Sequence, residues 1–181
     1  MKKILILMVL TLLPVVGFAQ NNHFFSYKSG SFDLDMNVTG QKMATHCVFD
    51  DFGALQSSEM PMMGQTIRTV IRDGKTYLVE PQFQEMTDQP DPINYSDLSP
   101  ENIEKYHIQM VGLETVDGYE CVIYTLMMEV QGMTAKGKVW VWEGFPIRTE
   151  TTVMGMKVVT LMKNLLLDVP VDSSLFELPA K

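Results

Sequence analysis

The clearest pattern in the chain is a strict alternation of apolar and polar residues between positions 31 and 38. The apolar positions of this stretch are Phe32, Leu34, Met36 and Val38. Their polar neighbours include Asp33, Asp35 and Asn37. Because successive side chains of a β-strand point to opposite faces, this spacing predicts a strand with one buried face and one solvated face.

The stretch from Thr66 to Glu80 predicts a β-hairpin. Two runs rich in β-branched residues, 66–72 and 76–80, are joined by Asp73-Gly74-Lys75. Asp-Gly favours a type I′ turn, which needs a positive φ at both central residues. Pro81 has no amide N–H to donate to a strand ladder, so the second strand should end before it.

The rest of the chain predicts a single, mostly β domain of about ten antiparallel strands with one helical insertion. Further strands are expected at 43–49, 55–60, 107–116, 119–130, 136–143, 147–154 and 156–167. Segment 87–106 interrupts the strand pattern with three prolines, and Ser99-Pro100 is a good start for a short helix ending near Tyr106. The tail, 171–178, allows one helical turn that places Leu175 and Phe176 on the body of the domain.

Several late strands are apolar on both faces, which is unusual for an antiparallel sheet with one side in water. In 119–130, one face carries Tyr124, Leu126, Met128 and Val130, and the other carries Cys121, Ile123 and Met127. Trp140 and Trp142 likewise alternate with valines. A helix, a ligand or the curling of the sheet on itself must therefore cover each face.

The first 19 residues are predicted to be a signal peptide, followed by one domain over 20–181. Lys2 and Lys3 precede an apolar run at 4–16, and Gly17-Phe18-Ala19 is a small-residue site for cleavage after Ala19. The alternative, an uncleaved anchor, is disfavoured because the run is shorter than the roughly 20 residues of a membrane span. No cysteine follows the run, so the protein should be exported to the periplasm without acylation.

Charge and cysteine content narrow the function classes further. Removing the two lysines changes the net charge from −8 to about −10. Such an acidic chain is a poor nucleic-acid binder. Cys47 and Cys121 can form a disulfide in an oxidising compartment or remain two buried thiols, and the sequence leaves both open.

No motif for catalysis, a metal or a cofactor stands out. His23, His46 and His107 are isolated, and no HExxH, CxxC or nucleophile-elbow spacing occurs, so we expect a non-enzymatic protein without a cofactor. Methionine is unusually frequent, with 15 residues in the chain. These methionines can be ordinary core, an adaptable surface for apolar ligands, or thioether ligands of Cu(I).

Several short motifs resemble those of the LolA/LolB-like superfamily of periplasmic lipoprotein carriers. The chain resembles an exported relative within this group rather than LolA itself. The matching motifs are DGKT at 73–76, Pro81 with Gln82-Phe83-Gln84, Tyr106-His107-Ile108, Gly118-Tyr119-Glu120-Cys121 with Tyr124, the turn from Trp142 to Pro146, and Leu175-Phe176-Glu177-Leu178-Pro179. The resemblance implies a curved, unclosed half-barrel whose concave apolar face holds acyl chains. The lid-latching arginine of the carriers has no counterpart in 49–61.

We therefore predict a monomeric periplasmic protein that binds a hydrophobic ligand, such as an acyl chain, lipid or lipoprotein moiety. An alternative is an envelope interaction or sensor module of the same fold with a membrane-protein partner, and a third is Cu(I) binding. The predicted lining is Phe32, Leu34, Met36, Ile67, Ile71, Tyr77, Val79, Tyr124, Leu126, Met128, Trp140 and Trp142.

Overall fold

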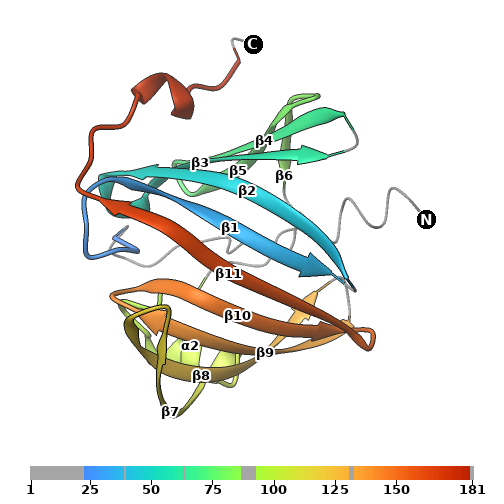
Figure 1. Ribbon diagram of the computed structural model, residues 1–181, viewed down its shortest axis with the longest axis vertical. Helices are drawn as coiled ribbons and strands as arrows, with labels where there is room; N and C mark the ends of the chain where they lie inside the picture. The colour runs from blue at the N-terminus through green and yellow to red at the C-terminus, as the bar shows by residue number, and fades with distance from the viewer. Residues whose placement is uncertain (1–22, 39, 63, 87–92, 131–132, 180–181) are drawn as a thin grey trace.

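The computed structural model describes residues 23–38, 40–62, 64–86, 93–130 and 133–179 (Figure 1). The predicted signal peptide, residues 1–19, lies outside the described residues. The described chain forms one antiparallel sheet of eleven strands. The strands are β1 (Gly30–Val38), β2 (Gln41–Asp50), β3 (Leu55–Met62), β4 (Gln65–Arg72), β5 (Lys75–Glu80), β6 (Gln84–Met86), β7 (Gln109–Val116), β8 (Tyr119–Val130), β9 (Met133–Trp142), β10 (Phe145–Val153) and β11 (Met156–Leu167).

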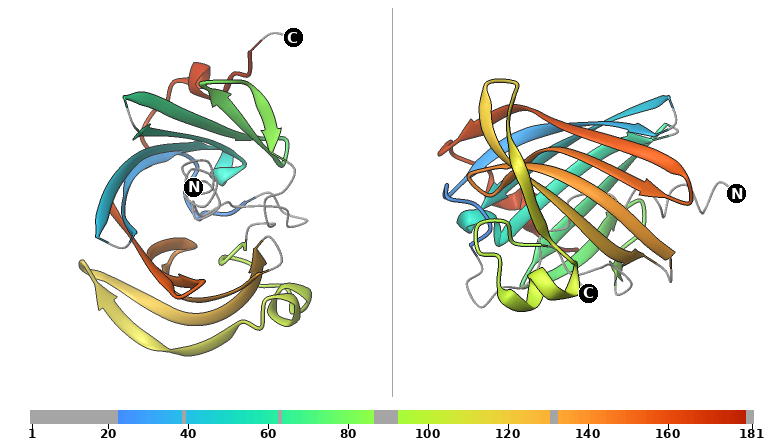
Figure 2. Two further views of the ribbon diagram at one scale, coloured as in Figure 1. Left: turned by 90° about the vertical axis from the view of Figure 1, so that its right-hand side faces the viewer. Right: turned by 90° about the horizontal axis from the view of Figure 1, so that it is seen from below.

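The sheet consists of two meanders joined by one long-range pairing. Strands β1 to β6 pair in sequence, strands β7 to β11 pair in sequence, and β1 pairs with β11. The two meanders form opposite walls of an open, curled sheet (Figure 2). The free edges are β6 and β7. The predicted curved, unclosed antiparallel sheet is confirmed, with one short strand, β6, that the sequence did not indicate.

Both Asp-Gly turns form where the sequence predicts them. Asp73 and Gly74 have φ values of 51° and 68°, and Asp117 and Gly118 have 48° and 90°. Positive φ at both central residues is the mark of the type I′ turn, whose twist matches that of the flanking strands. These turns set the register of β4 with β5 and of β7 with β8.

The capping residues set the two ends of the helical insertion. Helix α2 (Pro100–Lys105) starts at Ser99, whose hydroxyl accepts a 3.1 Å hydrogen bond from the Asn102 amide. Proline at the first helical position loses no hydrogen bond. Tyr106 follows as the C-cap and is buried. The predicted helix is confirmed, one residue shorter than expected.

The C-terminal segment packs on the outside of the first meander. The 3-10 turn η2 (Ser173–Phe176) lies over β3 and β4, and Phe176 is buried there. Arg68 Nη2 donates a 2.6 Å hydrogen bond to the carbonyl oxygen of Leu175. The tail therefore covers one face of β3 and β4, a position on the body of the domain that the sequence predicts only in general terms.

The two cysteines are both free and buried in the structure, which corresponds to the alternative of two thiols rather than to the disulfide. Register explains the separation. Cys47 pairs with Phe32, whereas Cys121 pairs with Glu114 in the other meander. Burial raises the pKa of both thiols, which keeps them protonated. In the described part of the chain, no helix is long and apolar enough to cross a membrane.

Candidate functional site on the inner face of the sheet

One face of the curled sheet carries many of its buried apolar residues. We call this the inner face and define it by Phe32, Leu34, Met36 and Val38, which are all buried. The pairing of β1 with β2 and β11 extends the face in both directions, because directly paired residues of neighbouring strands share a face. Three zones of different character lie along it.

The first zone is an aromatic cluster near the start of β1, which we call the aromatic end. It consists of Phe24, Phe25, Phe32, Phe49 and Phe145, all buried. The ring of Phe25 stacks on Phe145 with centroids 4.2 Å apart and meets Phe49 at 4.8 Å. The protein's own rings therefore fill this end of the inner face.

The segment before β1 is fixed in place by hydrogen bonds. The amides of Phe24 and Phe25 donate to the Phe52 carbonyl at 2.8 and 3.0 Å. Ser96 Oγ donates to the Phe24 carbonyl at 2.8 Å. Gly53 has a φ of 87°, and a Cβ there would lie 2.7 Å from the Phe25 ring. Both the backbone conformation and the close approach require glycine.

The second zone, the methionine zone, follows further along β1. Its buried residues are Met36, Val38, Met60, Ile67 and Val158, and the partly buried residues packed against them are Met43, Met62, Leu78 and Met86. Five methionines from four strands thus meet on one face. Unbranched thioether side chains adapt their shape more readily than aromatic or β-branched ones. This zone is the part of the inner face best suited to accommodate an apolar molecule.

Two buried hydroxyl groups stand beside the methionine zone. Thr45 is 1% exposed and pairs with Leu34, and Thr160 is 4% exposed and pairs with Met36. Within the described residues, neither Oγ1 atom has a hydrogen-bond partner. Buried polar groups in native proteins are nearly always hydrogen-bonded, so such a pair calls for a functional explanation. A few convergent polar groups in an apolar surface are typical of ligand sites.

The third zone lies on the inner face of β8 and β9, under segment 93–108. Its buried residues are Ile93, Tyr106, Ile108, Leu126, Val139 and Val141, and Tyr95, Leu98, Tyr124 and Met128 pack against them. The amide of Met127 donates to the Tyr106 carbonyl at 2.8 Å, which ties the segment to β8. Burial raises the pKa of Tyr95, so its hydroxyl stays neutral. The helical insertion thus covers one apolar face of the late strands.

The structure divides the twelve residues predicted to line a ligand site. Strand registers place eight of them on the inner face: Phe32, Leu34, Met36, Ile67, Ile71, Tyr124, Leu126 and Met128. Tyr77 and Trp140 lie on the opposite face, paired with Val70 and Arg148. Val79 lies at the register shift between β4 and β5. Trp142 lies at the end of β9 against Tyr119 and Phe145.

The structure also places on the inner face residues that were not among the twelve predicted from the sequence. Met60, Val158, Thr45 and Thr160 are the most informative of these. The period-two spacing of Thr45, Cys47 and Phe49 in the predicted strand 43–49 was a usable signal for the first of the two threonines. No local sequence pattern identifies Met60 or Thr160 as an inner-face residue. Met60 is placed there by its pairing with β4, and Thr160 by its pairing with β1.

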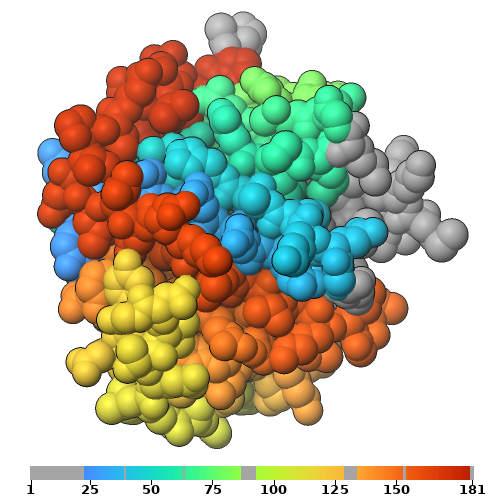
Figure 3. Space-filling view, in the orientation of Figure 1, coloured from blue at the N-terminus to red at the C-terminus, as the bar shows by residue number. Residues whose placement is uncertain are grey.

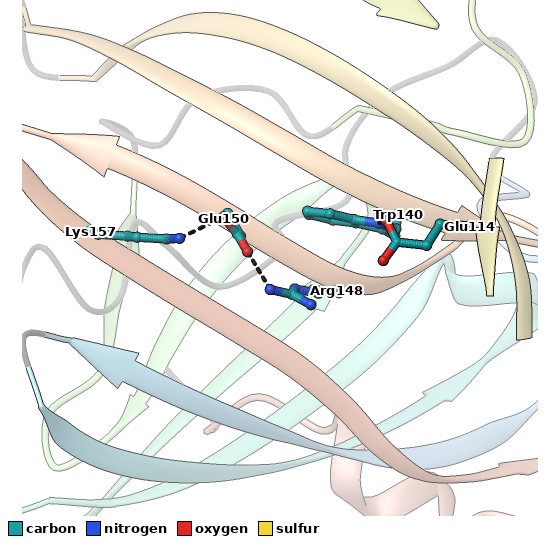
Figure 4. Close-up of polar contacts among 5 residues, drawn as sticks. All are labelled: Glu114, Trp140, Arg148, Glu150 and Lys157. Carbon is teal, nitrogen blue, oxygen red and sulfur yellow. Dashed lines mark hydrogen bonds and ion pairs between the residues drawn. The ribbon is translucent and has the colours of Figure 1, made fainter. Parts of the chain in front are cut away.

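Trp140 belongs to a polar cluster on the outer face (Figure 4). Its indole N–H donates to Glu114 Oε2 at 2.8 Å, and Lys138 and Arg148 lie 4.4 and 4.8 Å from its ring centroid. Arg148 also forms an ion pair with Glu150. These contacts bury a tryptophan beneath charged side chains, so they account for it without a ligand.

The same cluster lowers the pKa of Glu150, mainly through the hydrogen bond from Lys157 at 2.7 Å and also through Arg148. A depression of about 350 Å³ lies elsewhere on the outer face, between β1, β2 and β11, the strands that face the viewer in Figure 3. It is open and lined by side chains including Asp35, Lys42 and Leu161. Over the described ranges, no group of three or more His, Cys, Asp or Glu residues could hold a metal ion.

Solved structures share this fold, although no protein-family model and no curated protein sequence matches the chain. The Pseudomonas aeruginosa MucA/MucB complex matches with a TM-score of 0.55 and 15% identity over 83% of this chain. A structure of MucB alone matches with a TM-score of 0.54 and 11% identity over 88% of this chain. The matches cover 56% and 60% of those chains, so this chain spans somewhat more than half of MucB. An outer-membrane lipoprotein-sorting domain from Vibrio parahaemolyticus has a TM-score of 0.45, with 11% identity over 82% of this chain and 89% of that one.

Proposed function

On the premise that this chain is a distant relative with the LolA-like fold, we propose that it binds an apolar ligand on its inner face. The ligand class is an acyl chain, either of a lipid or of a lipidated protein, and the binding involves no chemical step. The observation that carries the proposal is the methionine zone, where adaptable apolar side chains adjoin two unpartnered hydroxyls. The place of action is the cell envelope, following the predicted export signal.

The methionine zone supplies enough binding free energy without any charged contact. Burying one methylene group contributes about 0.8 kcal/mol, so an acyl chain that buries ten contributes about 8 kcal/mol. This is the scale of a micromolar dissociation constant before entropic costs. The hydroxyls of Thr45 and Thr160 donate to an ester or carboxyl oxygen of the ligand and so fix where its polar end lies.

The test is to purify the exported, processed protein and analyse it by native mass spectrometry, with solvent extraction of any lipid that co-purifies. We expect a bound acyl lipid, and a fluorescent fatty acid should displace it at micromolar concentration. Changing Met60 to Glu should abolish probe binding, whereas the matched change at the exposed Met154 should not affect it. Circular dichroism and thermal melts check that the Met60 variant still folds. An empty protein that does not bind the probe contradicts the proposal.

A protein-binding module is the second candidate, and the crystal structures of MucB in complex with MucA favour it. In those structures a chain that contains this fold binds another protein. Applied here, the partner would be an envelope protein recognised without bound lipid. A pull-down with the lipid-free protein tests this candidate. Recovery of a membrane protein that is the same for the wild type and for the Met60 variant would favour it over the first.

Copper binding is the third candidate, because five methionines in one zone bring thioethers together. Titration with Cu(I) in competition with a chelator measures it directly. Affinity no tighter than micromolar would remove this candidate, while affinity lost when Met36 and Met60 are changed to Leu would support it.

A further inference from the structure

The two free edges of the sheet differ in how well they are protected. Strand β6 has only three residues, and Lys75 on its neighbour β5 forms a 2.9 Å ion pair with Glu85 on β6. Short, charged edge strands resist pairing with other chains. Strand β7 has eight residues and lies open at the opposite edge (Figures 1 and 2). Its backbone presents N–H and C=O groups on the side away from β8, and no other strand of the described chain pairs with them.

Exposed apolar side chains gather at this edge. The described residues include eight large apolar side chains that are exposed, and three of them belong to β7: Met110, Val111 and Leu113. Leu113 is 73% exposed and Met110 is 62% exposed, although both share the face of β8 that carries Val122 and Tyr124. Clustered exposed apolar residues on a strand edge mark a surface for interaction rather than ordinary solvent exposure.

The segment that contains the edge strand is acidic. Residues 101–120 contain five acidic residues and one lysine, which gives this segment a net charge of −4. Glu101, Glu104, Asp117 and Glu120 are all exposed. A second copy of this chain would bring these like charges together across the new pairing, which is unfavourable. A strand that carries lysine or arginine is complementary.

We propose that β7 is a docking edge for an extended segment of another protein, in which apolar residues alternate with lysine or arginine. The segment pairs with the free backbone of β7 as a twelfth strand and places its apolar side chains beside Met110 and Leu113. Its basic side chains lie near the acidic residues of α2 and of the β7–β8 turn. Such strand addition combines backbone affinity with side-chain specificity. The site lies at the free edge of β7, at the other end of the strand order from the strands that carry the methionines of the methionine zone, and does not depend on a ligand in that zone.

The probe is a nine-residue synthetic peptide in which valine or isoleucine alternates with lysine, labelled for fluorescence anisotropy. The variants are Leu113→Lys at the edge and, as a matched control, Leu166→Lys at the 56% exposed Leu166 of β11. Because both side chains are exposed, neither variant should unfold the protein, and thermal melts check this. We expect the wild type and L166K to bind the peptide alike and L113K to bind at least tenfold more weakly. Hydrogen exchange should slow within 109–116 when the peptide binds.

Four results would overturn the proposal. The first two are no measurable binding of the peptide to the wild type, and binding to L113K as tight as to the wild type. The other two are equally tight binding of a peptide with glutamate in place of lysine, and hydrogen exchange that slows outside 109–116 instead of within it. Sedimentation tests the other occupant: a wild-type dimer that L113K dissociates would assign the edge to a second copy of the chain and also overturn the proposal.

Discussion

The aromatic end and the methionine zone occupy the same face of the same sheet but are packed by opposite kinds of side chain. At the aromatic end, the centroid of the Phe25 ring lies 4.2 Å from that of Phe145 and 4.8 Å from that of Phe49, and such rigid rings allow little adjustment. In the methionine zone, five flexible thioether side chains replace the rings. The contrast teaches that one end of the inner face provides stability and the other provides adaptability. Each of the following changes tests that division.

The largest effect is expected at the aromatic end. Changing Phe49 to Ala removes a side chain that is fully buried among Phe25, Phe32 and Phe145. The cavity and the lost burial should lower the free energy of unfolding by about 3–5 kcal/mol. Urea denaturation measures the change. A loss below about 1 kcal/mol would show that the rings are not the rigid part of the inner face.

A smaller effect is expected in the methionine zone. Changing Met60 to Leu nearly conserves volume at a residue that is 1% exposed, so the loss of unfolding free energy should stay below about 1.5 kcal/mol. The stiffer side chain should instead narrow the range of acyl-chain lengths that bind. Competition binding across chain lengths tests this, with the exposed Met154→Leu as the control. An unchanged chain-length profile would argue against an adaptable site.

The hydroxyl beside the methionine zone should have opposite effects on stability and binding. Changing Thr160 to Val replaces a buried hydroxyl that has no hydrogen-bond partner in the described structure by a methyl group. Removing the unpaired group should leave the stability unchanged or raise it by about 1 kcal/mol. Affinity for a fatty acid should fall about tenfold, whereas affinity for an alkane of the same length should not. Equal losses for both ligands would contradict a polar contact.

The smallest effect concerns pH and belongs to the outer face. The lowered pKa of Glu150 stabilises the folded state above the carboxyl's unfolded pKa, and this stabilisation is lost as the pH falls through the folded value. Changing Glu150 to Gln should therefore cost about 0.5–1 kcal/mol at pH 7 and nothing near pH 2. Thermal melts over this range measure the difference. A cost that persists at pH 2 would assign it to packing rather than to charge.

Most of the fold could be predicted from the sequence because its signals are local. Alternation at 31–38 identified the buried side of β1, and the Asp-Gly pairs fixed two hairpins. The site was predicted less well. In a strand that is apolar on both faces, the spacing of apolar residues does not show which face is the inner one. Trp140 and Tyr77 could therefore not be assigned to a face from their spacing. The five methionines of the methionine zone come from β1, β2, β3 and β6, which strand pairing and the curl of the sheet bring together.

The pairing of β1 with β11 has a consequence for how the chain reaches its native state. Gly30 pairs with Leu167, residues from the first and last strands. A chain that emerges N-terminus first therefore completes ten strands before β11, the second partner of its first strand, exists. Pairings between such distant residues make folding slow, on a timescale of milliseconds to seconds. During that interval β1 has an unpaired edge and an apolar face, so the unfinished chain needs protection from aggregation until its last strand arrives.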